Sequence, residues 1–180
     1  MKTILLLLLV SLASCSGAQR PVTWDVAALA TIHTTAHGVA LADDGAEAYY
    51  RARTDALAAD GGVDGGPLRG AAYIVATAPL DATYVVFVRD LSTTRAALVL
   101  AETLVRQAVA LGVADLRCRA GLAVHDLVTD LDLVVADLAT LGVASDPLLL
   151  ADGQTLASIV TDLTTACTDG AVAASPQDIR

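Results

Sequence analysis

The sequence predicts an all-α protein, an antiparallel four-helix bundle, and three observations carry this prediction. Hydrophobic residues make up 55% of the 180 residues, and along most of the chain they recur every three or four positions, which is helical spacing. Glycine and proline clusters divide the chain into segments long enough to be helices. Short connections join these segments, so consecutive helices should run antiparallel within one domain.

The first predicted helix begins near Thr23, follows Pro21 and carries Asp25 in its first turn. It continues to about Ala59, and Gly45 is the place where it could break. Its spacing predicts an apolar face with Ile32 and Val39 on one flank and, at the centre, Val22, Val26, Leu29, Ala36 and Ala40.

A loop at residues 60–67, which hold four glycines and a proline, separates this helix from a stretch with two interpretations. Residues 71–90 contain two β-branched and aromatic runs, which are typical of a small β-hairpin turning near Pro79. Proline is also favoured at the first position of a helix, which predicts a helix from Pro79 to about Leu111. The helix is the favoured prediction, because a hairpin needs a partner sheet and no other strand is predicted.

The third helix carries the clearest pattern, a heptad seam of apolar residues. The seam advances by alternating steps of four and three residues through Ala120, Val124, Leu127, Leu131, Val134, Leu138 and Leu141. Gly142 is expected to end the helix. Asp130 and Asp137 flank the seam, where we expect them to stay solvated.

The last helix has two candidate starting points. Asp146 followed by Pro147 offers a cap and a first-turn proline, and Asp152 offers a later start. The helix should end near Thr168, and Gly153 could kink or divide it. Its inner face is predicted to contain Leu156, Ile159, Val160 and Leu163.

The N-terminus has the features of an export signal. A basic start precedes an apolar run over residues 4–13, which is shorter than the roughly 20 residues that span a membrane. The run ends in Leu12-Ala13-Ser14-Cys15, which resembles the lipobox of bacterial lipoproteins. This resemblance implies cleavage just before Cys15, thioether-linked diacylglycerol on Cys15 and acylation of the new N-terminus.

The lipobox resemblance also implies an organisation of the whole chain. Residues 1–14 would be a signal peptide, 15–22 a lipidated tether, 23–169 one helical domain and 170–180 a flexible tail. In that family an aspartate after the lipidated cysteine favours retention at the inner membrane, and the serine found here favours the outer membrane. An ordinary signal peptide cleaved after Ala18 is the alternative, and it also exports the protein.

The formal net charge of −9 limits the partners. Nucleic acid is not expected, because phosphate binding needs a basic face. Anionic lipid headgroups would repel such a surface, so lipid on Cys15 would hold the protein to a membrane in the bacterial envelope, facing the periplasm. After nucleic acid and anionic lipid are excluded, another protein of the envelope is the class of partner that we expect.

Two cysteines remain after Cys15 is lipidated or removed. In an oxidising compartment Cys118 and Cys167 are expected to form one disulfide, and two buried free thiols are the alternative. At the helical rise, Cys118 to Leu141 spans about 35 Å and Pro147 to Cys167 about 30 Å. The two cysteines therefore reach the same end of the bundle if the last helix begins at Pro147.

His33 and His37 are the candidate ligand-binding residues. They lie four residues apart, so both point to one side of the first helix, with His33 inside the expected apolar arc and His37 at its edge. Two imidazoles at this spacing can bind zinc or copper, with a third ligand from another helix. The alternative is a half-buried pair, hydrogen-bonded to backbone or to a carboxylate, and no other cofactor is expected.

The sequence predicts no enzyme. The G-x-S-x-G elbow is missing, and so is the glutamate of an H-E-x-x-H zinc site. We therefore expect a lipid-anchored, non-catalytic helical bundle with a structural or binding role in the bacterial envelope. The alternative is a periplasmic bundle that binds a metal or a small cofactor through His33 and His37.

Overall fold

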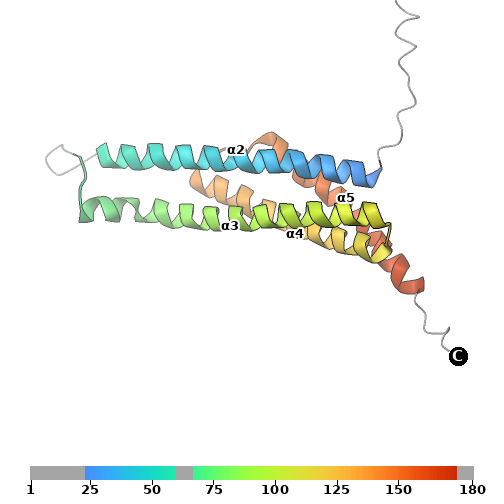
Figure 1. Ribbon diagram of the computed structural model, residues 1–180. Coiled ribbons are helices and arrows are strands. Elements are labelled where there is room, and N and C mark those ends of the chain that lie inside the picture. The colour runs from blue at the N-terminus through green and yellow to red at the C-terminus, as the bar shows by residue number, and fades with distance from the viewer. Residues whose placement is uncertain (1–22, 60–66, 174–180) are drawn as a thin grey trace, which may run out of the picture.

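The computed structural model describes residues 23–59 and 67–173, which form four α-helices (Figure 1). In chain order they are α2 (Trp24–Ala59), α3 (Ala71–Leu111), α4 (Ala114–Leu141) and α5 (Pro147–Ala173). Consecutive helices run antiparallel, and α2 and α4 each pack against both α3 and α5. The predicted all-α four-helix bundle is confirmed. The predicted signal peptide, the tether and Cys15 lie outside the described residues.

The heptad seam of α4 forms the centre of the core, as predicted. All seven of its residues are buried, each with 3% or less of its surface exposed. Phe87 and Leu91 of α3 and Leu156 and Leu163 of α5 belong to the same buried cluster. Gly142 ends α4 in the left-handed conformation, with φ +82°, which glycine adopts without strain.

The buried face of α2 differs from the predicted one. Val26 is 56% exposed, and Ala36 and Ala40 are also exposed. Small and hydroxyl-bearing residues form most of the buried stripe, which consists of Ala28, Thr31, Ile32, Thr35, Gly38, Val39, Ala42, Ala46 and Thr54. Threonine is tolerated there because its hydroxyl group donates to a carbonyl one turn earlier, as Thr35 does to Thr31 at 2.8 Å. The helix continues through Gly45 without a break.

Two glycines let α5 approach its neighbours closely. A Cβ atom on Gly38 of α2 would lie 3.1 Å from Leu149 Cδ1. A Cβ atom on Gly121 of α4 would lie 3.0 Å from Leu163 Cβ. Both distances are shorter than ordinary carbon–carbon contacts, so glycine at these two positions sets the spacing between α5 and the helices beside it.

Residues 71–90 are helical, so the hairpin interpretation is wrong, and the predicted start at Pro79 is wrong as well. The helix α3 begins at Ala71 after Gly70, whose φ of +59° suits glycine, and Pro79 lies inside it. Packing against α2 outweighs local preference here, because Thr77 and Phe87 are buried while Pro79 faces solvent.

The helices α2 and α3 extend together beyond α4 and α5 (Figure 1). The turn that joins α4 to α5 lies beside α2, where Tyr49 Oη is 3.4 Å from the Cβ position of Gly142. Beyond this turn, two tyrosines hold the pair together. The rings of Tyr50 and Tyr84 stack at 4.3 Å, and Tyr50 Oη donates to Asp81 Oδ1 at 2.7 Å. We call this two-helix extension the arm.

The helix α5 begins at Pro147, the earlier of the two predicted starts. Asp146 caps it, because its Oδ1 accepts a hydrogen bond from the Leu148 amide at 2.8 Å. The helix continues through Gly153 to Ala173. It therefore passes both the predicted end near Thr168 and the predicted boundary of the tail at residue 170.

Candidate functional site

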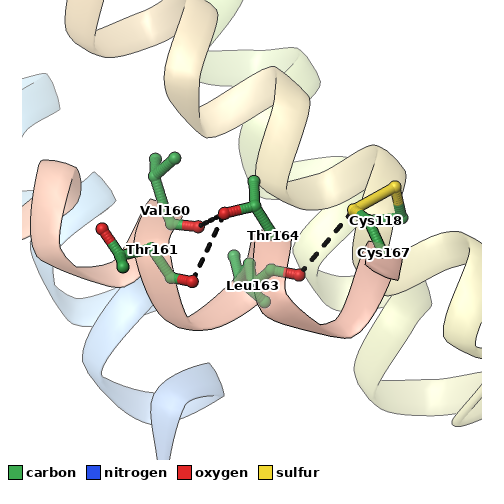
Figure 2. The surroundings of a disulfide bond; sticks show 6 residues. All are labelled: Cys118, Val160, Thr161, Leu163, Thr164 and Cys167. Carbon is green, nitrogen blue, oxygen red and sulfur yellow. Dashed lines mark hydrogen bonds between the residues drawn. A yellow bond between two sulfur atoms is a disulfide. The ribbon is translucent and has the colours of Figure 1, made fainter. Parts of the chain in front are cut away.

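A disulfide joins Cys118 at the beginning of α4 to Cys167 near the end of α5 (Figure 2). Their Cα atoms lie 5.0 Å apart, within the range that an unstrained backbone allows. Because α5 begins at Pro147, it is long enough to bring Cys167 level with Cys118, as the helix lengths predicted. The bond closes a loop across 49 residues and, in the chain-entropy model, stabilises the fold by up to about 4 kcal/mol.

His33 and His37 both lie on the surface of α2, so the predicted placement of His33 in the apolar arc is wrong. The reason is that the buried stripe of α2 passes through Ile32 and Val39, which were predicted on the flank of the apolar face, together with threonine, alanine and glycine. The prediction that both histidines share one side of the helix is correct, because both line the same pocket.

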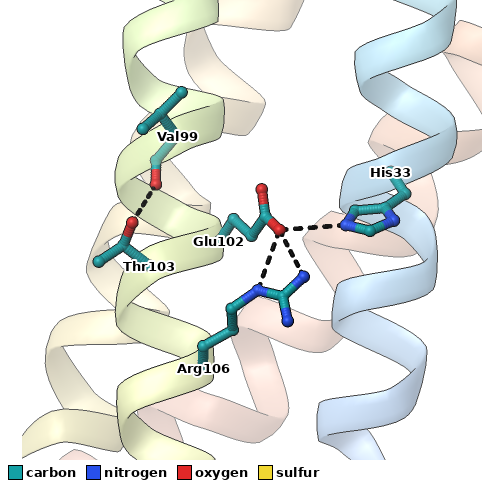
Figure 3. Close-up of polar contacts among 5 residues, drawn as sticks. All are labelled: His33, Val99, Glu102, Thr103 and Arg106. Carbon is teal, nitrogen blue, oxygen red and sulfur yellow. Dashed lines mark hydrogen bonds and ion pairs between the residues drawn. The ribbon is translucent and has the colours of Figure 1, made fainter.

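His33 of α2 belongs to a small polar network with Glu102 and Arg106 of α3 (Figure 3). Its Nε2 lies 3.1 Å from Glu102 Oε1, which also accepts hydrogen bonds from Arg106 Nη2 at 2.7 Å and Nε at 3.0 Å. The hydrogen bonds from Arg106 and then from His33 lower the pKa of Glu102. The three side chains are partly to largely exposed, so solvent screens the network and it resembles an ordinary surface ion pair.

A pocket of about 290 Å³ lies between α2 and α5. The close contact between Gly38 and Leu149 brings the α2 residues of the pocket next to those at the N-terminal end of α5. They comprise two histidines, two aspartates, three further α2 residues and a leucine, namely His33, Thr34, His37, Gly38, Leu41, Asp146, Leu148 and Asp152. Asp152 Oδ2 is shielded from solvent and has no hydrogen-bond partner among the described residues.

The pocket brings two carboxylates to the side of α2 that carries the histidines, which the sequence did not predict. Among residues 23–59 and 67–173, however, no three His, Cys, Asp or Glu side chains are placed to hold a metal ion together. His125, which lies on the outer face of α4, is exposed. The arrangement can offer imidazole nitrogens and carboxyl oxygens to a ligand that enters the pocket.

A second polar group lies between α3 and α4. Asp130 and Asp137 are half-buried there, so they are less solvated than their place beside the seam predicted. Asp137 faces Asp90, and burial first and then Asp90 raise the pKa of Asp137. A hydrogen bond from Arg89, whose Nε is 2.7 Å from Asp90 Oδ1, lowers the pKa of Asp90.

A single proton can connect this aspartate pair. When both groups are ionised, Asp137 Oδ2 is buried and has no donor among the described residues. A proton on Asp137 would form a hydrogen bond with Asp90, which adds to burial in raising the pKa of Asp137 and to Arg89 in lowering the pKa of Asp90. Burial, and after it Asp126 and Asp90, also raises the pKa of Asp130.

The outward face of α3 is apolar along much of its length. Several large side chains on it are about half exposed or more, among them Ile74, Val75, Val85, Val99 and Leu100. By length and composition α3 could cross a membrane, with a most apolar stretch of mean hydropathy 1.5 that is 11% buried. A membrane span is not favoured by the position of Asp81, an acidic residue within α3 that accepts a hydrogen bond from Tyr50 of α2.

Comparisons with protein-family models, with curated proteins and with solved structures found no match for this chain.

Proposed function

We propose that this chain is a lipid-anchored protein of the bacterial envelope, a non-catalytic helical bundle with a structural or binding role. The observation that carries the proposal is the sequence Leu12-Ala13-Ser14-Cys15 at the end of a short apolar leader. The Cys118–Cys167 disulfide supports it, because such bonds persist in oxidising compartments outside the cytoplasm.

The surface of α3 supports a binding role. Large apolar side chains exposed along one helix are typical of a surface that contacts another macromolecule. An acidic protein gains little from anionic headgroups, so the lipid on Cys15 would anchor the bundle and leave this face free to meet a partner.

Fractionation of a Cys15→Ala variant tests the anchoring. The wild-type protein should be processed, fractionate with membranes and partition into detergent. The variant should remain unprocessed by the lipoprotein peptidase or move to the soluble fraction. A Ser16→Ala variant is the matched control and should behave as wild type. Unchanged migration and fractionation of Cys15→Ala would contradict the proposal.

A second candidate function is the binding of a metal or a small cofactor beside His33 and His37. The observation that favours it is the pocket between α2 and α5, which both histidines line together with Asp146 and Asp152. If a metal binds there, zinc or copper should raise the melting temperature, and His33→Ala should abolish the rise. An unchanged wild-type melting temperature would exclude the metal.

A further inference from the structure

We propose that the pocket between α2 and α5 binds a small organic cation with a short apolar body, of which an aliphatic amine is the simplest example. The inference rests on the second candidate function, since it names the class of ligand for that pocket. It does not depend on whether Cys15 carries lipid.

The walls of the pocket suit the apolar part of such a ligand. Leu41 from α2 and Leu148 from α5 both line the pocket and are 44% and 66% exposed. Gly38 also lines the pocket and contributes no side chain to it. At about 290 Å³ the pocket is at the small end of the range for ligand sites, so it fits a compact molecule.

The polar groups of the pocket suit a positive charge. Asp152 Oδ2 is shielded from solvent and has no hydrogen-bond partner among the described residues, so this side chain can accept a donor that a ligand supplies. Asp146 adds a second carboxylate, of which Oδ1 already accepts from the Leu148 amide. An ammonium group supplies N–H donors and the opposite charge, after rotation of the Asp152 side chain toward the opening.

Other ligand classes fit less well. A metal needs three or four converging donors, and no such set is present among the described residues. One of the two imidazoles, that of His33, already contacts Glu102 through Nε2. An anionic ligand would meet two carboxylates in the pocket and a chain of formal net charge −9.

Thermal unfolding with matched ligands tests the inference. The full-length protein, expressed with its own leader and recovered as the cell processes it, is titrated with hexylamine, 1-hexanol, hexanoate or zinc chloride. Hexylamine should raise the melting temperature with an apparent affinity at least about tenfold higher than that of 1-hexanol, as one charge-assisted hydrogen bond allows. Hexanoate should leave the melting temperature unchanged.

Two variants with the same change in net charge separate the pocket from general attraction to an acidic protein. Asp152→Asn should reduce the preference for hexylamine over 1-hexanol to about one, as expected when the paired charge is lost. Asp55→Asn, on the exposed surface of the arm, should keep the preference. If Asp152→Asn does not fold, amide chemical shifts of Gly38 and Leu41 in the wild-type protein provide the readout, and hexylamine should move them more than 1-hexanol.

Three results would overturn the inference. Equal effects of hexylamine and 1-hexanol would show an apolar pocket without charge selection. No effect of either ligand, together with unmoved Gly38 and Leu41 amides, would show no pocket for this class. A rise with zinc alone would overturn the organic cation and leave the second candidate function standing.

Discussion

At the scale of single residues, most polar groups in this core are satisfied by their own helix. The buried threonine hydroxyls donate to carbonyls one turn earlier, at 2.9 Å for Thr31 and 2.8 Å for Thr94. Asp137 and Asp152 differ, because each has a shielded oxygen with no hydrogen-bond partner among the described residues. An unsatisfied buried polar group costs about 1–3 kcal/mol, so these two positions are where the fold is least well satisfied.

The pKa directions at Asp137 and Asp90 predict a dependence of stability on pH. Because folding raises the pKa of Asp137, the protonated form of this group stabilises the folded state. Its contribution to the free energy of unfolding is fully present below the pKa of the unfolded chain, about 3.9, and is lost as pH rises through the pKa of Asp137 in the folded protein. The lowered pKa of Asp90 acts in the opposite direction, with a contribution that is lost as pH falls through its folded pKa.

Asp137→Asn should therefore raise the free energy of unfolding at pH 7 by about 1 kcal/mol, because the amide can donate to Asp90 as a protonated carboxyl does. At pH 4 the increase should be smaller. Urea unfolding at the two pH values measures both effects. Asp132→Asn, on the exposed face of the same helix, is the control and should change little. A loss of stability at pH 7 would contradict the assignment.

At the scale of elements, residues 71–90 show how a partner helix decides between two local structures. Their β-branched residues favour a strand, yet the segment packs as helix along α2 with Thr77 and Phe87 buried. Pro79 remains in the helix because it faces solvent, although it removes one backbone hydrogen bond.

Replacement of Pro79 by alanine tests this element. In a helix interior the change restores an amide donor and improves helix propensity, so the free energy of unfolding should rise by about 1–3 kcal/mol in urea titrations. A proline in a hairpin turn would give the opposite sign, because its removal would free the unfolded chain without adding a helical hydrogen bond. A decrease in stability would thus argue against the helix.

The close approach of α5 to α4 depends on Gly121. Gly121→Ala should lower the free energy of unfolding by about 1–3 kcal/mol, because the new methyl group would lie 3.0 Å from Leu163 Cβ. Gly153→Ala is the matched control, with nothing within 4 Å of the new Cβ atom, and should raise it by about 0.5–1 kcal/mol. Chemical denaturation measures both, and equal effects would contradict the packing described here.

At the scale of the whole molecule, the architecture followed from helical spacing and short connections, and the large apolar residues of α4 were enough to predict which face of that helix is buried. The seam from Ala120 to Leu141 has helical spacing and large side chains, so its buried face could be identified without neighbours. The face of α2 could not be identified in this way, because threonine, alanine and glycine form most of it.

The part of the candidate site that lies within one helix was predictable from the sequence, and the part that depends on how two helices pack was not. The spacing of His33 and His37 placed them on one side of one helix. Asp146 and Asp152 join them through the register of α5 on α2, which the Gly38–Leu149 contact fixes. Sequence spacing within one helix carries no information about such a register. The cysteines were an exception, because matched helix lengths brought them to the same end.

The central claim, that the bundle is held to a membrane by lipid on Cys15, is tested most directly by the mass of the mature N-terminal peptide. Mass spectrometry of protein extracted from membranes should find a peptide that begins at Cys15 and carries diacylglycerol and an acyl group. A soluble mature protein that begins at Gln19 without lipid, after cleavage behind Ala18, would contradict the claim.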